Sequence, residues 1–428
     1  NIIIRGNNTT KDKVIRREVL VNPGEIMDEP RIERSENRLK NLGYFKNVRH
    51  YTEQVNQPGT RDLVYDVEEQ RTGNFMVGAG FSSIDNLVGF MEVTQSNFDI
   101  LNWPNFTGGG QKARLGLEAG TRRQTAEVSL TEPWFLDRPL ALTVEAYRRM
   151  RWYDQYDETR TGASAGLSYP VKVGRVGARY TLEMVEMDDV DKGLWVTDPN
   201  ASPDDLPDEQ MARYFKYQED QYSGNLNSVM RLYWAHDTRD QAFVPTKGYQ
   251  TTIFGDASEG GLGDNEFYKL GGNYRQWFPL PWYKHVVSVR GRLETVDAYS
   301  GDLPIYERLF LGGPRTIRGV EYRDVGPKVY RGDGSSKHAP IGGQTLAMAS
   351  TEYTIPVFKA VRFATFMDVG SLGEDAFDPQ LSDVCVSVGI GLRIDIPGFP
   401  IRFDVATPVV SDDDYTDEEY FSFAIGFE

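Results

Sequence analysis

From about residue 72 to the last residue, apolar and polar positions alternate with a period of two, which is the pattern of β-strands. The segment 361-VRFATFMDVG-370 is the clearest case, because its odd positions are mostly apolar and its even positions include Arg362 and Asp368. The same alternation recurs in three further segments, 286–295, 384–395 and 401–405. The pattern predicts sixteen strands, which start near residues 73, 86, 111, 124, 139, 159, 174, 218, 248, 267, 284, 344, 361, 383, 400 and 419.

The first part of the chain lacks this alternation and includes two helical segments. Its elements are predicted in the order strand, helix, helix, strand, strand, at about residues 2–4, 10–20, 28–42, 46–52 and 62–68. Thr9 or Thr10 is a suitable N-cap for the first helix, and Gly43 is a suitable residue just beyond the second. We therefore predict a small α+β domain of β-α-α-β-β order at 1–70 and a β-rich domain at 71–428.

Alternation alone fits two architectures. A soluble sandwich would turn its apolar side chains inward, whereas a membrane barrel would turn them toward lipid and its charged side chains toward a wet lumen. The connections distinguish the two, because compact proline-bearing segments alternate with longer acidic ones. The compact segments are 133–139, 169–174, 278–283, 355–359 and 396–400, and the longer ones include 188–210, 298–343, 371–383 and 409–419. One connection at the compact end, 98–110, is long and is expected to pack against the N-terminal domain.

Short turns at one end and long loops at the other are typical of bacterial outer-membrane barrels. Aromatic residues also gather at the strand ends, as in an interfacial girdle: Trp134, Phe135, Trp277, Phe278, Trp282 and Tyr283. We therefore predict a mainly β chain in which a sixteen-stranded antiparallel transmembrane β-barrel follows one small α+β domain. An even strand number places both termini on the periplasmic side. A strand that begins at Ile2 indicates that further sequence lies upstream.

Composition excludes several other functions. A net charge of −16 argues against a nucleic-acid surface, and the single cysteine, Cys385, excludes an internal disulfide framework. The four histidines have no metal-site spacing, and the chain contains neither a Gly-x-Ser-x-Gly elbow nor a P-loop. Acidic loop residues such as 204–205 are expected to be solvated, with a calcium site at 412–414 as a minor alternative. We therefore expect no catalytic residue, no metal and no cofactor.

Five motifs, in order along the chain, resemble those of the family of the outer-membrane insertase BamA. They are 36-ENRLKNLGYFKNVRH-50, 237-DTRDQAFVPTKG-248, 312-GGPRTIRGVEY-322, 366-FMDVG-370 and 421-FSFAIGFE-428. The first is similar to part of a POTRA domain, the third to the loop-six motif, and the last to the closing strand. The chain departs from the family pattern in having one POTRA-like module, Val320 in place of an aromatic residue, and Glu428 in place of a terminal aromatic residue.

The resemblance implies that loop 298–343 folds into the lumen and places Arg318 against Glu352 and Asp368. A guanidinium suits this role, because its planar fork of donors matches carboxylates in a confined site. Gly319 would allow a tight backbone turn beside Arg318, and Gly370 belongs to the strand motif that contains Asp368. A solvated Arg318 is the alternative, and Arg315 is the second candidate for the tether.

The junction between the first and last barrel strands is the second candidate site. The first strand, 73-GNFMVGAGFSS-83, has three glycines, which weaken strand pairing, so that the barrel could open there. An exposed strand edge could then pair with a substrate strand. The residues assigned to this lateral gate are Gly73, Phe75, Gly78, Gly80, Phe421, Phe423 and Gly426. Glycines that merely fit a tight barrel corner are the alternative.

The resemblance implies a non-enzymatic insertase of the bacterial outer membrane, with its N-terminal domain in the periplasm. Its expected partners are unfolded outer-membrane proteins, accessory lipoproteins bound through the POTRA domain, and outer-membrane lipids, but no nucleic acid. A secretion pore of the same superfamily, of the two-partner or TamA-like type, is the alternative. A passive porin is a weaker alternative, because a porin needs neither a POTRA domain nor a tethered loop.

Overall fold

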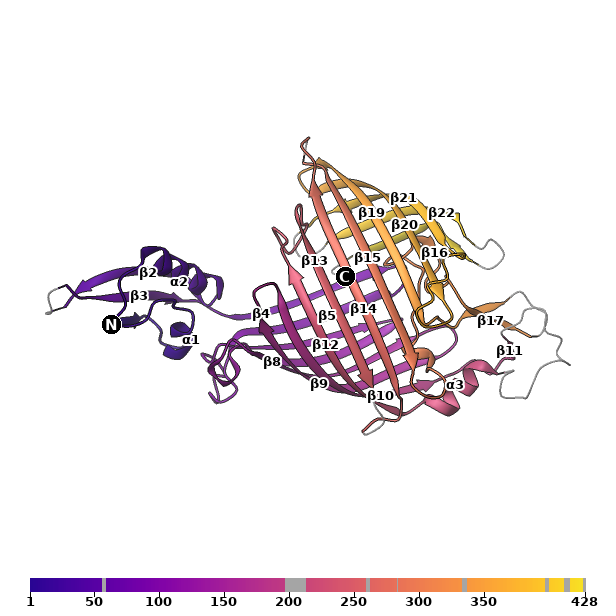
Figure 1. Cartoon of the computed structure of the whole chain (residues 1–428), viewed down its shortest axis with the longest axis horizontal. Helices are drawn as coiled ribbons and strands as arrows, with labels where there is room; N and C mark the ends of the chain where they lie inside the picture. Colours follow the sequence, from indigo (N-terminus) through magenta and orange to yellow (C-terminus); the bar gives the residue numbers. More distant parts are fainter. Residues whose placement is uncertain are drawn as a thin grey trace. The chain divides into compact units, whose positions relative to one another are not determined.

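The computed structural model describes residues 1–55, 59–196, 213–258, 262–282, 284–332, 337–396, 400–411 and 416–425 (Figure 1). The chain divides into two compact units. The first unit contains residues 1–77, 91–116 and 127–145, and the second contains the remainder. Predictions at 204–205, at 412–414 and at Gly426 lie outside the described residues.

The N-terminal module has the predicted order of elements. They are β1 (Ile2–Arg5), α1 (Asp12–Arg16), α2 (Glu29–Asn41), β2 (Phe45–Gln54) and β3 (Arg61–Glu69). The sheet has the order β1-β3-β2, with β1 parallel and β2 antiparallel to β3. Both helices bury apolar side chains against it, including Val14, Ile15, Ile32 and Leu39. The two helices and the sheet therefore share one hydrophobic core.

The first helix is shorter than predicted, and its cap differs. It begins after Lys11, which makes no side-chain capping bond, rather than after Thr9 or Thr10. The Thr10 hydroxyl instead accepts a hydrogen bond from Asn97 Nδ2 at 2.9 Å. The second helix has its expected ends, since the Asp28 side chain accepts from the Arg31 amide and Gly43 adopts φ +70°.

The remaining sequence forms a closed antiparallel barrel, as predicted. Its sixteen strands in the described part of the chain are β4 (Gly73–Ser82), β5 (Asn86–Phe98), β6 (Gln111–Gly120), β7 (Arg123–Glu132), β8 (Ala141–Trp152), β9 (Asp157–Pro170), β10 (Arg175–Asp188), β12 (Asn225–Asp237), β13 (Gly248–Ser258), β14 (Phe267–Pro279), β15 (Val286–Ala298), β19 (Thr345–Phe358), β20 (Val361–Gly373), β21 (Cys385–Ile394), β22 (Ile401–Val410) and β24 (Phe421–Ile425). Each pairs with its neighbour along the chain, and β24 pairs with β4 to close the cylinder.

One strand start is wrong. The eighth strand begins at Asn225 rather than near residue 218, because 218 lies in the helix α3 (Tyr214–Tyr222). That helix buries Phe215 completely in a cluster of loop side chains that includes Tyr156 and Trp195. Burial of an aromatic residue on one helical face outweighed the strand propensity of this tyrosine-rich segment.

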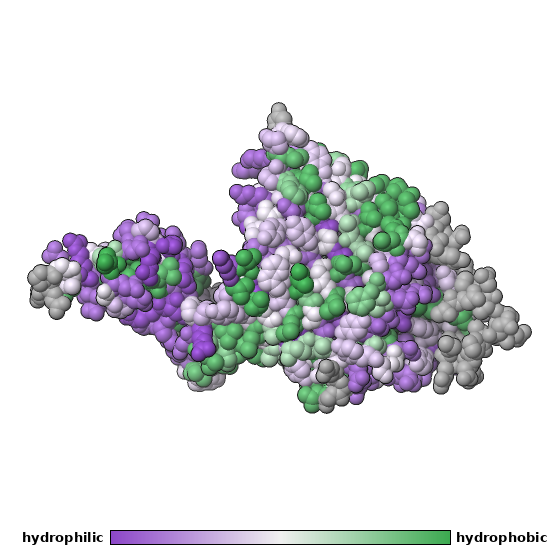
Figure 2. Space-filling model, in the orientation of Figure 1, coloured by the Kyte–Doolittle hydropathy of each residue, from purple (hydrophilic) through white to green (hydrophobic). Residues whose placement is uncertain are grey.

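Alternation assigns the two faces of the wall correctly. Met367 on β20 is 47% exposed, whereas the neighbouring Asp368 is completely buried. Hydrophobic residues accordingly lie across the outer surface of the strands in Figure 2. Among the described residues, no helix is long and apolar enough to cross a bilayer.

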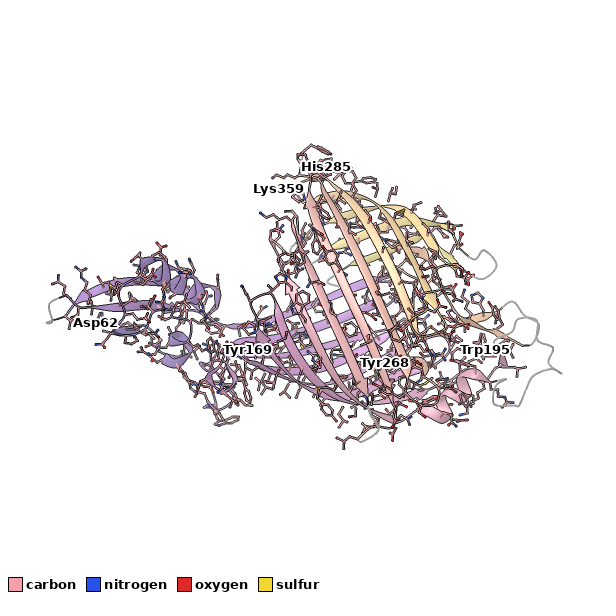
Figure 3. The ribbon with its side chains drawn as sticks, in the orientation of Figure 1. Asp62, Tyr169, Trp195, Tyr268, His285 and Lys359 are labelled. Atoms are coloured by element: carbon pink, nitrogen blue, oxygen red, sulfur yellow. The ribbon has the colours of Figure 1, made fainter. Side chains whose placement is uncertain are left out.

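The two ends of the barrel differ as predicted. Tyr169, His285 and Lys359 in Figure 3 mark the end with short connections, and Tyr268 and Trp195 mark the opposite end. The long connections contain β11 (Trp195–Val196), α3, the 3-10 turn η3 (Ile305–Glu307), β16 (Gly319–Val320), β17 (Lys328–Arg331), β18 (His338–Pro340) and β23 (Glu418–Glu419). Strands β11, β17 and β18 form a small sheet over this end.

Candidate functional site

The Arg318 side chain lies in the barrel lumen and binds two acids on neighbouring strands. Its Nε and Nη2 donate to the two oxygens of Asp368, each at 2.7 Å, and its Nη1 donates to Glu352 Oε2 at 2.9 Å. The guanidinium carbon lies 3.3 Å from the centre of the Phe366 ring. The structure therefore brings together the three residues that the sequence singled out for the tether.

Strand register places these acids side by side. Asp368 on β20 pairs with Ser350 on β19, and Glu352 pairs with Phe366, so all four side chains point to the lumen. The Ser350 hydroxyl donates to Asp368 Oδ1 at 2.6 Å. This bond fixes the carboxylate in the orientation that accepts both donors of the Arg318 fork.

Two glycines give the loop room to approach the wall. Gly319 has φ +89°, and a Cβ there would lie 2.9 Å from the Ala406 carbonyl carbon. A Cβ at Gly370 would lie 3.0 Å from Leu311 and 3.2 Å from Ile317, two buried side chains of the loop. Each glycine therefore permits a close contact between loop and strand that a side chain would block.

Val320, where the family pattern has an aromatic residue, is 1% exposed. It belongs to an apolar cluster with Leu311, Ile317 and Leu346, and its backbone pairs with Glu418 in the two-stranded sheet β16–β23. The tip of the loop is therefore packed without an aromatic side chain at this position.

The charged network is larger than the sequence indicated. Arg393 on β21 donates to Glu352 Oε2 at 2.8 Å, and it also lies 2.8 Å from Asp404 Oδ1 on β22. Asp404 lies 3.9 Å from Arg318. The two residues lie on neighbouring strands, and their positions along the barrel axis bring them to the tether.

Electrostatics keep Arg318 charged. Burial alone would lower the pKa of its guanidinium, but the hydrogen bonds and charge of Asp368, with the charges of Glu352 and Asp404, raise that pKa above its usual value. The cation is therefore a permanent partner of the three acids rather than a group that titrates.

A second anchor joins the loop to other strands of the wall, and no motif in the sequence indicated it. Glu307 lies 3.4 Å from Arg160 on β9 and 3.4 Å from Lys269 on β14. Its Oε1 also accepts from Asn227 Nδ2 at 3.1 Å. Here the loop supplies the acid and the wall supplies the cations, which is the reverse of the arrangement at Arg318.

The other two arginines of the loop motif have different partners. Arg315 lies 3.6 Å from Asp85, in the connection between β4 and β5, and its carbonyl accepts from Arg290 at 2.7 Å. Arg323 lies 3.2 Å from the centre of the Phe310 ring and 4.3 Å from that of Tyr153. Contact with both tether acids therefore belongs to Arg318 and not to the second candidate, Arg315.

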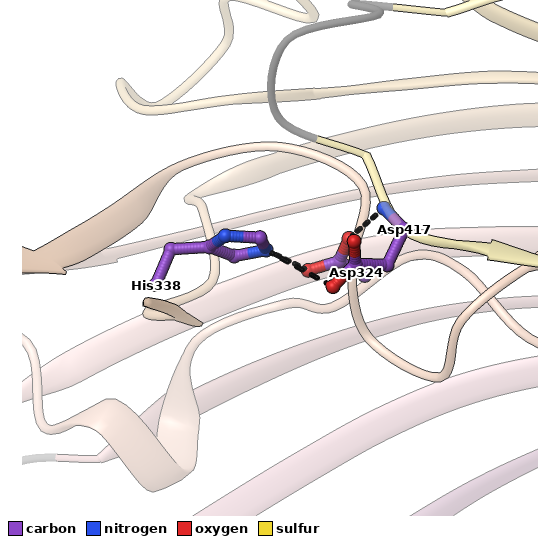
Figure 4. A group of neighbouring side chains, drawn as sticks. All are labelled: Asp324, His338 and Asp417. Carbon is purple, nitrogen blue, oxygen red and sulfur yellow. Dashed lines mark hydrogen bonds and ion pairs between the residues drawn. The ribbon is translucent and has the colours of Figure 1, made fainter. Parts of the chain in front are cut away.

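The loop also binds the segment that leads into the last strand. The Glu321 amide donates to the Asp417 carbonyl at 2.9 Å, and the Asp417 amide donates to Asp324 Oδ2 at 2.7 Å. His338 Nε2 lies 3.3 Å from Asp324 and 3.6 Å from Asp417 (Figure 4).

Figure 4 draws three side chains that could bind a metal ion, and a lysine also lies against one of them. Lys328 Nζ donates to Asp324 Oδ2 at 3.0 Å. The hydrogen bond that the His338 ring donates to Asp324 raises the pKa of His338 above its ordinary value, which favours the imidazolium. Lys328 and His338 therefore both lie against the carboxylates of this group.

The part of the seam between the first and last strands that lies in the described residues is short. In the described residues β24 pairs with β4 at two positions, Ala424↔Ser82 and Ile425↔Phe81. The rings of Phe81 and Phe423 stack across it, with their centres 4.9 Å apart. By contrast, β9 and β10 pair continuously from Arg175↔Pro170 to Asp188↔Asp157.

The residues assigned to the gate lie on both sides of this seam, apart from Gly426, which is outside the described range. Phe75 is 62% exposed and Phe421 is 50% exposed, so both point outward. A Cβ at Gly78 would lie 2.6 Å from the Phe90 ring, so this glycine makes room for a ring on the next strand. Gly78 is therefore required for packing, which is the alternative to a role in the gate. A Cβ at Gly73 would meet no such close contact.

The chain matches two protein-family models and resembles several known proteins. Residues 105–428 match the Omp85 superfamily domain, and residues 1–70 match a POTRA family described as a surface antigen variable number repeat. The chain is similar to the outer membrane protein assembly factor BamA of Nitratidesulfovibrio vulgaris, with 28% identity over 95% of this chain and 48% of that relative. The same factor of Neisseria meningitidis is 27% identical over 87% of this chain and 46% of that relative.

The fold agrees with a solved structure of the same kind. BamA from Haemophilus ducreyi lacking POTRA domains 1–3 superposes with a TM-score of 0.80 at 24% identity, covering 99% of this chain and 83% of that one. The chain spans about half the length of the curated relatives that it matches. It is an outer-membrane protein with a periplasmic POTRA module, and it belongs to the Omp85 superfamily.

Proposed function

We propose that this chain is the membrane part of an insertase that folds and inserts β-barrel proteins into the outer membrane. The matched BamA proteins are named as assembly factors. We assign residues 1–70 to a periplasmic POTRA domain that binds incoming chains and accessory lipoproteins, and residues 71–428 to the transmembrane barrel. No covalent step is part of this proposal, because folding into a membrane requires only that a kinetic barrier be lowered.

The observation that carries the proposal is the short pairing between β24 and β4. On β4, residues 73–80 precede the two paired positions, and the described part of β24 ends at Ile425. A strand edge with unpaired amides and carbonyls is a template for a further strand. We infer that the seam opens, that the edge of β4 pairs with a substrate strand, and that the gate residues on both strands line this opening.

The loop tether supports the seam in this mechanism. Arg318 attaches the loop to β19 and β20, while Arg315 approaches Asp85 beside the first strand and Glu321 binds Asp417 before the last strand. The loop thus contacts both sides of the seam from within the lumen. It also occupies space that a passive porin would leave open, which weighs against a porin.

A disulfide lock across the seam tests the proposal. Cysteines at Ser82 and Ala424, which are cross-strand partners, would be introduced in a Cys385→Ser background. We expect the oxidised form to lose assembly of outer-membrane porins in cells that depend on this chain, and reduction to restore it.

A matched lock within the closed wall is the control. Ala235 and Thr252 are cross-strand partners on β12 and β13, so cysteines there should form a disulfide without reducing porin assembly. Full assembly activity with the seam lock fully oxidised would exclude the lateral gate. Loss of activity with both locks would point to a general effect of crosslinking instead.

A further inference from the structure

The turn that joins β5 to β6 displays large apolar side chains to the outside. Ile100 is 51% exposed, Leu101 is 85% exposed and Trp103 is 79% exposed. In the next turn at the same end, between β7 and β8, Leu136 is 71% exposed. Hydrophobic residues gather over the chain segments that join the first barrel strands in Figure 2. Such a group of exposed apolar residues on one surface indicates a contact partner.

Hydrogen bonds and ring contacts within the turn hold it in a defined conformation. The Phe106 amide donates to the Asn102 carbonyl at 2.6 Å, and Asn102 Nδ2 donates to the Thr107 carbonyl at 2.8 Å. The Phe106 ring stacks on Phe98, with centres 5.7 Å apart, and meets the Trp103 ring edge-on at 5.2 Å. The indole is therefore held in place while most of its surface stays exposed.

The other side of the same turn is polar and packs against the N-terminal module, as its length had suggested. The Lys11 amide donates to the Gly108 carbonyl at 2.9 Å, and Arg17 Nη2 donates to the Gly110 carbonyl at 3.3 Å. Asn97 donates to the Thr10 hydroxyl at 2.9 Å. The turn is thus amphipathic, with one side satisfied by protein and the apolar side uncovered.

The apolar side continues a surface that already faces lipid. The strands on either side of these turns carry exposed apolar residues on their outward faces: Val93, Leu115, Val128 and Val144. Tryptophan is the side chain that most favours the boundary between headgroups and acyl chains, because its ring is apolar and its N–H is polar. The neighbouring Arg138 is exposed and can extend toward lipid headgroups.

We propose that the β5–β6 turn, assisted by Leu136, is a lipid-binding surface that inserts into the headgroup–acyl boundary of the periplasmic leaflet. Ile100, Leu101 and Trp103 contact the lipid, and the opposite side of the turn holds residues 10–17 of the POTRA module next to the membrane. The inference rests on the location of the barrel in the outer membrane and not on the insertase activity, so the two fail independently.

Fluorescence in a bilayer tests this contact. The whole chain with Cys385→Ser and Leu101→Cys would be labelled with the fluorophore NBD and placed in vesicles of phosphatidylethanolamine and phosphatidylglycerol. Val128→Cys on the outward face of β7 serves as the lipid-exposed reference, and Asn37→Cys on an exposed position of α2 serves as the water-exposed reference. We expect the Leu101 label to show blue-shifted emission and several-fold stronger quenching by spin-labelled lipid than the Asn37 label.

Two results would overturn the proposal. Emission and iodide quenching equal to those of the Asn37 label would show that the turn lies in water. Protection from both iodide and spin-labelled lipid would show that the turn is covered by protein. If the cysteine-free background fails to fold, brominated lipid can be used on the native chain, where Trp103→Phe should remove a lipid-quenched part of the tryptophan emission.

Discussion

Asp368 accepts two hydrogen bonds from the guanidinium of Arg318, each at 2.7 Å, although the two residues lie on different elements and Asp368 is completely buried. The pair attaches a long loop to the inside of the barrel wall. An acid buried in this way depends on its cation, because desolvation of an unpaired carboxylate is costly.

Arg318→Ala should therefore destabilise the barrel strongly. Removing one partner of a buried ion pair costs about 3–5 kcal/mol, since it leaves a buried charge unpaired. Thermal unfolding in detergent should shift to lower temperature, and the loop should become susceptible to protease. Arg318→Lys should recover only part of this loss, because an ammonium cannot form the two parallel bonds. Arg138→Ala, at an exposed turn position, is the control, and equal stability of the two alanine variants would contradict the tether.

Gly319→Ala should lower the free energy of unfolding by more than the left-handed backbone conformation alone would cause. A residue other than glycine in the left-handed region costs about 1–2 kcal/mol. At Gly319 the added Cβ would also lie 2.9 Å from the Ala406 carbonyl carbon. Gly24 is the matched control, since it has φ +87° and no atom within 4 Å of the same Cβ position.

The difference between these two glycine variants measures the close approach of loop and wall. We expect Gly319→Ala to lower the midpoint of thermal unfolding further than Gly24→Ala and to increase hydrogen exchange at Glu418 and Glu419, the partners of β16. Similar unfolding midpoints would mean that the contact with Ala406 relaxes at little cost.

Glu307→Gln should weaken the second anchor, because it removes the charge and keeps a side chain of nearly the same size. Hydrogen bonds that involve charged groups contribute about 1.5–3 kcal/mol, so we expect a loss of that order. Arg160 retains Glu158 at 2.6 Å and Glu183 at 3.0 Å, which limits the damage. The free energy of unfolding would be measured for Glu307→Gln, Arg318→Ala and the double variant. A loss in the double variant that differs from the sum of the two single losses would show that the two anchors act together.

The contact between the loop and the segment before the last strand should weaken as pH rises. The hydrogen bond that the His338 ring donates to Asp324 raises the folded-state pKa of His338 above the usual value of about 6.5. A raised pKa contributes stability that is complete below the unfolded value and is lost as pH rises through the folded value. Hydrogen exchange corrected for its intrinsic pH dependence should therefore show weaker protection of Asp417–Glu419 at alkaline pH than at acidic pH.

The groups that face His338 are Asp324, Asp417 and, through Asp324, Lys328. His338→Gln should abolish the pH dependence in this segment, because it removes the imidazole whose pKa is raised. His285→Gln, at the opposite end of the barrel, should leave it unchanged. A pH dependence that survives His338→Gln would assign it to another group.

The sequence determined the local structure because alternation has the same period as a strand. It assigned Asp368 to the polar positions of its strand and predicted the start of nearly every strand within a few residues. It misjudged residue 218 and the cap of α1, because the partners of Phe215 and Thr10 come from distant segments. Propensity cannot weigh contacts of that kind.

Tertiary structure decided which lumenal charges meet. Strand register and barrel closure bring Arg393 on β21 to Glu352 on β19 and to Asp404 on β22. Glu307 finds Arg160 and Lys269 only because the loop crosses the lumen. In the described residues, the pairing of β24 with β4 spans two positions, and the segment before β24 pairs with β16. The sequence by itself fixes the face of each strand residue, whereas the position of that residue along and across the barrel follows only from closing the sheet.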